Sequence, residues 1–450
     1  MRYPVALLLS LICSLPLHAQ DLSIDPHMYG IIDSVSAERL ESDIRTLAGF
    51  GTRHTMSDTV SSTRGIGAAR RWIKQEFEKI SRDNDGRLEV FEQRTLLEGD
   101  PATRIDEDTW IVNVYAVIRG TTHPGRYVVM SGDIDSRASD VMNADIDAPG
   151  ANDNASGMAG VIEAARVLVK HEFNNSIVLA GLSGEEQGLY GGKFMAERAI
   201  GEGWDLIGVL NNDMIGNIEG LDGVIDNRSF RIFSEPYPAR ATQSELQQKR
   251  FYGGENDGDS RQLARYVHET TTTYMPEMDP VLIYRLDRFG RGGHHRSFNE
   301  AGFAGIRIME THENYNRQHQ DVRTENGIEY GDVLKGVNFE YAKKLTAVNA
   351  VALASLAQAP PDPANVKIGG IVQPSTLLSW DRSGSELTEG YKIYWRDTTS
   401  PVWQYSRYVG DVDSFTLEGI VIDNYLFGVS SVGRDGHESV VSYPSGLIRN

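Results

Sequence analysis

Cysteine is nearly absent from this 450-residue chain, in which Cys13 is the single example. The sequence after residue 13 can therefore form no disulfide and offers no cysteine to a metal. Basic residues are also in the minority, because 44 Lys and Arg stand against 63 Asp and Glu, for a net charge of -19. A surface of this sign repels nucleic acid and anionic lipid, so we expect neither as a partner.

Long apolar runs are rare too, and the N-terminus holds the clearest one. The segment MRYPVALLLSLICSLPLHAQ combines an early Arg2, an apolar core and a small residue at Ala19. This order is typical of a secretory signal peptide, and the core is too short to span a bilayer. We therefore predict a signal peptide over residues 1–19, no membrane span, and a secreted or periplasmic protein.

The next part of the chain, residues 20–358, alternates segments of strand and helix periodicity. Such alternation predicts an α/β domain in which helices cover both faces of a mixed, mostly parallel sheet. The helical candidates are residues 36–50, 66–80, 157–173, 259–274 and 332–358, and the strand candidates include residues 126–136, 175–184 and 205–216.

The pattern changes at residue 359. The Pro-rich stretch APPDPANVKIGG predicts a linker, and short alternating strands follow it at the spacing of a β-sandwich. The segment YLFGVSSVGRDGHES resembles the last two strands of a fibronectin type III domain. We therefore predict a linker and a fibronectin type III-like, all-β domain over residues 359–450. Attachment to a cell surface or polymer and stabilisation of the first domain are its alternative roles.

Acidic residues are concentrated where the predicted strands end. In a parallel-type sheet these ends meet at one edge, so the carboxylates would share one crevice. Carboxylates that close cannot all stay ionised without a cation, which predicts one or two divalent metal ions. The acidic residues are Asp133 and Asp135 in SGDIDS, Asp153 in PGANDNASG, Glu185 and Glu186 in SGEEQG, and Asp213 in NNDMIG.

Six motifs between about residues 40 and 355 together resemble the M28 family of metallopeptidases, which has the dizinc aminopeptidase-like fold. In chain order they are GDIDSR, APGANDNASGMAGVIEAARVL, LSGEEQGLYGG, NNDMIG, GGHHRSFNEAGF and YNRQHQDV. The resemblance implies a peptide or protein substrate, two divalent metal ions of which zinc is the usual one, and aminopeptidase activity. It also implies that Glu185 is the general base that takes a proton from a metal-bridging water. The implied metal ligands are Asp133 and Asp213 for the first ion, Glu186 and His319 for the second, and Asp153 as the bridge.

Several positions depart from the family pattern. Asp133 stands where the family usually has His, so Asp135 loses its usual task of orienting that imidazole. The more anionic shell would suit Mn, Mg or Ca better than an ordinary dizinc site does. His294 stands where relatives commonly have an acid, next to His295, which we predict to lie beside the substrate or the ligands. Asp321 is the predicted partner of the other nitrogen of His319.

Two other functions are compatible with the same residues. A glutaminyl cyclase-like enzyme would hold one zinc with Asp153, Glu186 and His319, and Glu185 would move the proton. A metal-poor binding protein on a peptidase scaffold would explain the departures at Asp133 and His294, but it would have no reason to keep Glu185.

Overall fold

A computed structural model describes residues 24–448, so the signal peptide predicted over residues 1–19 lies outside the described residues. The larger part of the chain is built on an eight-stranded sheet of order β1-β2-β4-β3-β5-β8-β6-β7. Its strands are β1 (Leu88–Leu97), β2 (Thr109–Ile118), β3 (His123–Asp133), β4 (Asn175–Leu182), β5 (Asp205–Asn212), β6 (Ser229–Ser234), β7 (Asp279–Ile283) and β8 (Gly305–Glu310).

The centre of this sheet is parallel. Strand β3 pairs in parallel with β4 and β5, and β5 pairs in parallel with β8. Strands β1 and β2 run antiparallel at one side, and β6 runs antiparallel to β8 at the other. The predicted mixed, mostly parallel sheet is thus confirmed, and the carboxyl ends of β3, β4 and β5 lie next to one another.

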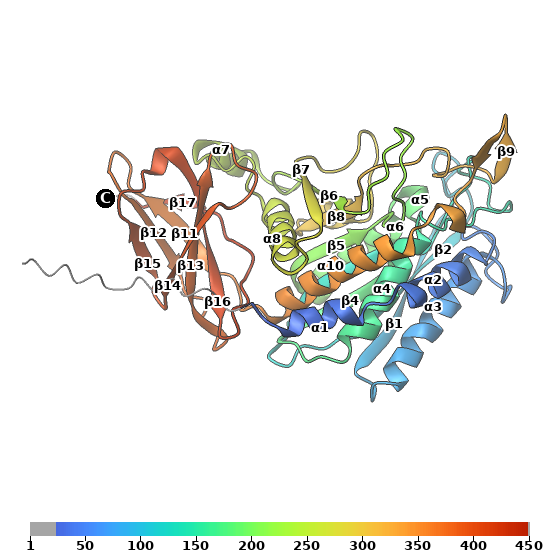
Figure 1. The fold of residues 1–450 in the computed structure, drawn as a ribbon, viewed down its shortest axis with the longest axis horizontal. Helices are drawn as coiled ribbons and strands as arrows, with labels where there is room; N and C mark the ends of the chain where they lie inside the picture. Colours follow the sequence, from blue (N-terminus) through green and yellow to red (C-terminus); the bar gives the residue numbers. More distant parts are fainter. Residues whose placement is uncertain (1–23, 449–450) are drawn as a thin grey trace, which may run out of the picture.

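Helices cover both faces because alternate strand residues point to opposite sides. On β3, Val128 and Met130 pack into the core under the larger group of helices, whereas Tyr127 and Val129 pack into a smaller core on the other face. The larger group, seen in front of the sheet in Figure 1, comprises α1 (His27–Ser34), α2 (Ala37–Ala48), α3 (Gly65–Arg82), α4 (Ala155–Leu168), α8 (Asp259–Tyr274) and α10 (Phe339–Gln358). The opposite face carries α6 (Tyr190–Glu202) and α9 (His295–Glu300).

Helix α6 has no counterpart among the predicted helices. Its first turn contains Gly191 and Gly192, which weaken the helical pattern of the sequence. A side chain at Gly191 would place its Cβ 2.4 Å from the Ser183 carbonyl oxygen, and one at Gly192 would come within 2.7 Å of His294 Nδ1. The two glycines therefore let the helix approach the end of β4 closely.

The C-terminal part forms two further sheets, of order β15-β12-β11-β17 and β14-β13-β16. They enclose a separate apolar core that includes Trp380, Tyr391 and Phe427. The first strand lies within the stretch predicted as a linker, because NVKI alternates buried and exposed residues after the prolines. The strands are β11 (Ala364–Gly369), β12 (Thr376–Asp381), β13 (Thr388–Asp397), β14 (Tyr405–Gly410), β15 (Ser414–Leu417), β16 (Tyr425–Gly433) and β17 (Gly446–Leu447).

A buried ion-pair cluster joins the C-terminal sheets to α8. The carboxylate of Asp257 lies 2.7 Å from Arg265 on α8 and 2.8 Å from Arg396 on β13. All three side chains are almost fully buried. Figure 1 shows the C-terminal sheets beside α7 (Gln243–Phe251) and α8, away from α5 (Glu185–Gly188). The junction is therefore remote from the carboxyl ends of β3 and β4.

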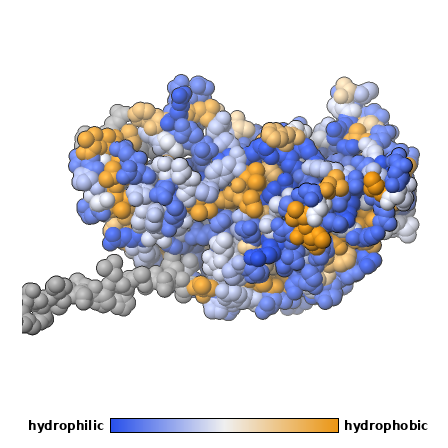
Figure 2. All heavy atoms as spheres, turned by 45° about the horizontal axis from the view of Figure 1, so that its top comes forward, coloured by the Kyte–Doolittle hydropathy of each residue, from blue (hydrophilic) through white to orange (hydrophobic). Residues whose placement is uncertain are grey.

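No helix among residues 24–448 combines the length and apolar character that crossing a bilayer requires. Figure 2 shows a mainly hydrophilic face on which apolar residues form small, scattered groups.

Replacing Asp257 by Asn should destabilise the protein strongly, because two buried guanidinium groups would lose their only shared carboxylate. We expect the free energy of unfolding in urea to fall by about 3 to 5 kcal/mol. The matched control is Asp411→Asn, which weakens an exposed pair with Arg382 and should change stability by less than about 1 kcal/mol. Equal effects of the two substitutions would contradict the importance of the buried cluster.

Candidate metal centre

A tight turn after β4 brings Glu185 and Glu186 to the edge of the sheet. Strand β4 ends at Leu182, and Gly184 takes a left-handed conformation with φ 76°, which directs the chain into the short helix α5. Glycine adopts this conformation without the steric penalty of a side chain. Both acidic residues therefore lie in the first turn of α5 and line the same cleft.

Asp135 fixes this turn from the end of β3. Its Oδ2 accepts the backbone N–H of Glu186 at 3.0 Å and the hydroxyl of Thr55 at 3.2 Å. The side chain is buried. Asp135 thus has a structural reason to be present even though no imidazole stands at position 133.

Three of the five predicted ligands converge. His319 Nε2 lies 3.0 Å from Asp153 Oδ2 and 3.1 Å from Glu186 Oε1. One potential ligand atom from each residue lies within 4.8 Å of the others, and this is the one such group found among residues 24–448. Two carboxylates and one imidazole form a ligand set that suits zinc and leaves a position open.

The electrostatics of the group favour a cation. Burial lowers the pKa of His319, but the neighbouring carboxylates of Glu186 and Asp153 outweigh it and raise that pKa to about 9. Burial also raises the pKa of Glu185, and the charges of Glu186 and Asp213 raise it further. The floor of the cleft therefore attracts positive charge.

Asp213 is already paired with an arginine. Its Oδ2 lies 2.7 Å from Nη2 of Arg307, whose side chain is fully buried. The same guanidinium lies 3.1 Å from Oδ2 of Asp287. Arg307 comes from the apolar strand β8, so its charge is supplied from inside the sheet.

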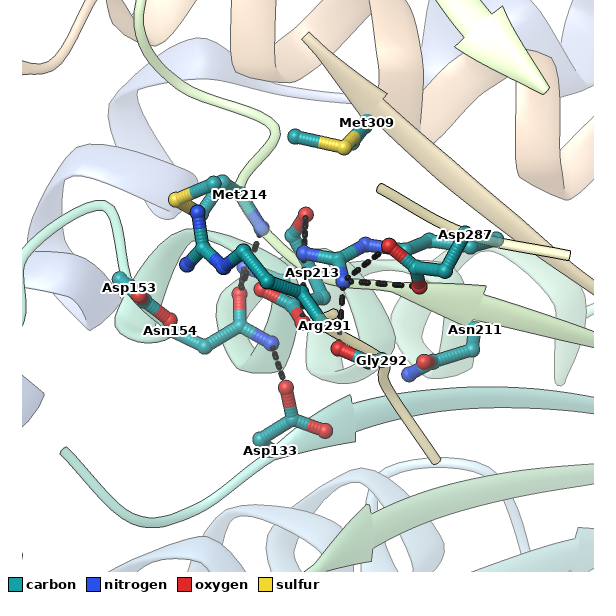
Figure 3. A network of polar contacts seen from close by, with 12 residues as sticks. Asp133, Asp153, Asn154, Asn211, Asp213, Met214, Asp287, Arg291, Gly292 and Met309 are labelled. Carbon is teal, nitrogen blue, oxygen red and sulfur yellow. Dashed lines mark hydrogen bonds and ion pairs between the residues drawn. The ribbon is translucent and has the colours of Figure 1, made fainter. Parts of the chain in front are cut away.

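Asp133 is hydrogen-bonded through one of its two oxygens. Oδ2 accepts a hydrogen bond from the Asn154 amide at 2.7 Å, and Oδ1 lies 3.6 Å from His294 Nε2. Figure 3 shows Asn154 joined to Asp133 on one side and to Met214 on the other. His294 Nδ1 accepts the N–H of Gly192 at 3.1 Å, which assigns the ring proton of a neutral His294 to Nε2, facing Asp133.

The two carboxylates predicted to bind the first metal ion each have a partner within the protein, Asn154 for Asp133 and Arg307 for Asp213. Asp133 and Asp213 take part in no group of three potential ligands among the described residues. Burial lowers the pKa of His294 to about 3, so the ring is neutral, and its Nε2 faces Asp133 Oδ1 at 3.6 Å without a hydrogen bond between them. Compared with the family pattern, the acid stands at position 133 and the histidine at position 294. Asp213 forms its ion pair with Arg307.

The other predicted residues lie outside this group. His295 is buried, and its Nε2 lies 2.9 Å from the Leu286 carbonyl oxygen and 3.5 Å from Asp287 Oδ2. It stabilises the segment before α9 and does not line the cleft. Asp321 accepts the backbone N–H of Ser139 at 3.0 Å, so its carboxylate binds that loop, and no hydrogen bond joins it to His319 among the described residues.

Two residues important for the site, Asp332 and Arg307, are not predicted from the sequence. Asp332 accepts the backbone N–H of Asn152 at 2.9 Å and that of Asp153 at 2.6 Å, which positions the Asp153 side chain. Nothing in the local sequence around Asp332 indicates this task. The sequence does contain a signal for Arg307, because it is the one basic residue within the apolar strand GIRIME.

Asp332→Ala should weaken metal binding, because it removes the acceptor for both N–H groups. Loss of such a supporting contact typically lowers metal affinity by about 10-fold to 100-fold. Competition with a chromogenic chelator measures the change. Asp332→Asn retains one acceptor oxygen, so its metal affinity should lie between those of the wild type and Asp332→Ala. The control Glu329→Ala changes an exposed neighbouring residue and should leave the metal affinity unchanged. Unchanged affinity in Asp332→Ala would contradict the positioning role.

Comparison with known proteins adds sequence relatives. Residues 113–333 match the model of peptidase family M28. A probable zinc metalloprotease of Pyrenophora tritici-repentis is 41% identical over 93% of this chain and 87% of its own. Another from Leptosphaeria maculans is 41% identical over 93% of this chain and 97% of its own.

Solved structures share the fold at much lower identity. LapB from Legionella pneumophila superposes with a TM-score of 0.53 at 18% identity and covers 75% of this chain and 76% of its own. The LapA aminopeptidase of the same organism gives a TM-score of 0.53 at 16% identity, with the same coverage. The fungal relatives match almost the whole chain at well over 30% identity, and the chain belongs to peptidase family M28.

Proposed function

We propose that the chain is a zinc peptidase with one metal ion, held by Asp153, Glu186 and His319. The observation that carries the proposal is the convergence of these three side chains beside Glu185 at one edge of the sheet. The names of the fungal relatives support zinc as the metal. The pairing of Asp213 with Arg307 supports one ion instead of two.

Hydrolysis needs an activated water and a proton carrier. When bound, the zinc ion would polarise the peptide carbonyl and make a water molecule more acidic. Glu185 accepts the proton of the attacking water and returns it to the leaving amine. Burial, followed by the charges of the neighbouring carboxylates, raises the pKa of Glu185, which suits a group that must take up a proton.

Gln318 supplies a further donor at the cleft. Its Nε2 lies 3.2 Å from Asp153 Oδ2, and its Oε1 accepts from Arg291 at 3.1 Å. An amide held in this way offers a hydrogen bond to the oxygen that becomes negative when the carbonyl is attacked. We propose that role for Gln318.

Release of residues from the amino end of peptides remains part of the proposal. It rests on the resemblance described above and on the aminopeptidase named among the structures that share the fold. We also propose export by the N-terminal segment and a fibronectin type III-like identity for the two C-terminal sheets. Attachment to a surface or polymer through these sheets is a further proposal.

Glu185→Gln should abolish most of the activity without loss of the metal. The amide cannot accept the water proton, and loss of general base catalysis lowers kcat by about 100-fold to 10,000-fold. Peptide hydrolysis and elemental analysis of the same preparation test this. A variant that keeps its metal and more than a tenth of the activity would contradict the assignment.

Metal content distinguishes one ion from two. We expect one zinc per chain in the wild type, none in His319→Ala, and still one in Asp133→Asn, because Asp133 serves Asn154 and His294. Elemental analysis after dialysis measures the ratio. Two zinc ions in the wild type and one in Asp133→Asn would overturn the single-ion assignment.

Glutaminyl cyclase-like chemistry is the second candidate, and the three-residue group favours it, since that chemistry uses one zinc held by Asp, Glu and His. A peptide with an N-terminal Gln separates the candidates. Release of ammonia with retention of the full peptide length would identify a cyclase, and release of a free amino acid would identify a peptidase. We expect the amino acid, because the relatives at 41% identity are named as proteases.

A further inference from the structure

Guanidinium groups dominate the walls of the cleft beside the candidate metal centre. The cleft has a volume of about 260 Å3, and its floor carries Asp153, Glu185, Glu186, Asp213 and His319. Five arginines line the rest of it, although the chain as a whole has a net charge of -19. They are Arg104, Arg137, Arg288, Arg291 and Arg296.

Four of these arginines retain charge for a ligand. Arg104 donates to the Glu186 carbonyl oxygen at 2.8 Å, and no carboxylate among the described residues pairs with it. Arg137 donates to backbone carbonyls, and its nearest carboxylate oxygen, on Glu186, lies 4.0 Å away. Arg296 has one exposed partner, Glu300, at 3.4 Å.

Arg288 and Arg291 both contact Glu313, and Arg288 also lies 3.3 Å from Asp287. Glu313 Oε2 lies 2.7 Å from Arg288 and 3.3 Å from Arg291, and its Oε1 lies 2.8 Å from Arg231. Three carboxylates, Glu313, Asp287 and Asp213, are thus shared by four guanidinium groups, those of Arg231, Arg288, Arg291 and Arg307. Arg291, with 29% of its side chain exposed, therefore also contributes positive charge to the cleft.

The cleft has no carboxylate among its described lining residues beyond those already assigned. All four of the carboxylates that line it belong to the proposed ligands, the proposed base or the pair with Arg307. No further acid among the described residues faces it to receive an ammonium group. The electrostatic complement of these walls is an anion.

We propose that this cleft selects peptides by a carboxylate close to the scissile bond. Arginine binds carboxylates through paired, charge-assisted hydrogen bonds, and the low exposure of Arg137 strengthens such contacts. A volume of about 260 Å3 is smaller than most sites for drug-sized ligands, so only the residues nearest the bond fit. The carboxylate belongs either to an acidic side chain or to the C-terminus of a very short peptide.

This inference rests on the proposed peptidase function but concerns binding, so binding tests it separately. Zinc-loaded Glu185→Gln protein is titrated calorimetrically with tetra-alanine and with variants that carry Glu or Gln at each position. Each peptide is used with a free and with an amidated C-terminus. If the cleft binds an acidic side chain, one Glu peptide should bind at least about tenfold more tightly than its Gln counterpart. If it binds the C-terminus, the peptides with a free C-terminus should bind at least about tenfold more tightly than the amidated ones.

Arginine variants in the same protein locate the effect. Four variants replace one arginine each by Gln, at Arg104, Arg137, Arg291 or Arg296. At least one of them should reduce the preference for the acidic peptide about tenfold. The control Arg407→Gln, on an exposed strand of the C-terminal sheets, should leave this preference unchanged. Loss of preference only for Glu peptides identifies a side-chain site, and loss only for free acids identifies a C-terminal site.

Two results would overturn the inference. Gln and amidated peptides could bind as tightly as their acidic counterparts, or a preference could survive within twofold in all four cleft variants. Hydrolysis of tetra-alanine by the wild type is measured in parallel. If that activity is present while the preference is absent, the inference fails and the peptidase function stands.

Discussion

Repulsion among buried carboxylates is the constraint on which the site depends. The ends of β3, β4 and β5 bring several acids into one small volume, and burial together with mutual repulsion raises the pKa of Asp133 and Glu185 well above their usual ranges. The fold meets this repulsion with local positive charge and N–H donors. Arg307 pairs with Asp213, His319 lies between Asp153 and Glu186, and Asp135 accepts a backbone N–H.

This distribution of partners is the physical basis of the proposed single-ion centre. In a two-metal site, a second cation would neutralise the acids of β3 and β5. Here a fixed guanidinium does so for Asp213, and the neutral ring of His294 faces Asp133. The exchange of an acid and a histidine between positions 133 and 294 keeps both residue types in contact.

Much of this architecture follows from sequence periodicity and turn chemistry. The buried runs of β3, β4 and β5 predicted the sheet, and the acids after them predicted its functional edge. The helices over residues 36–50 and 66–80 appear as α2 and α3. Asp153, Glu186 and His319 come from three distant segments, so their convergence was inferred from the family motifs and not from spacing.

The remaining features depend on contacts that the linear sequence does not encode. Arg307 looks like an isolated charge in a strand until Asp213 and Asp287 are placed around it. Asp332 reaches the backbone of Asp153 from a segment about 180 residues away. The glycines near the start of α6 resemble a turn, and only the proximity of Ser183 and His294 explains them. Each case concerns a pairwise contact between distant segments rather than a local preference.

The most direct test of the single-ion centre is a crystal structure of the zinc-loaded protein with anomalous diffraction data collected on both sides of the zinc absorption edge. The account predicts one anomalous peak, coordinated by Asp153, Glu186 and His319, with Arg307 still paired with Asp213. A second peak coordinated by Asp133 and Asp213, with Arg307 displaced, would contradict it.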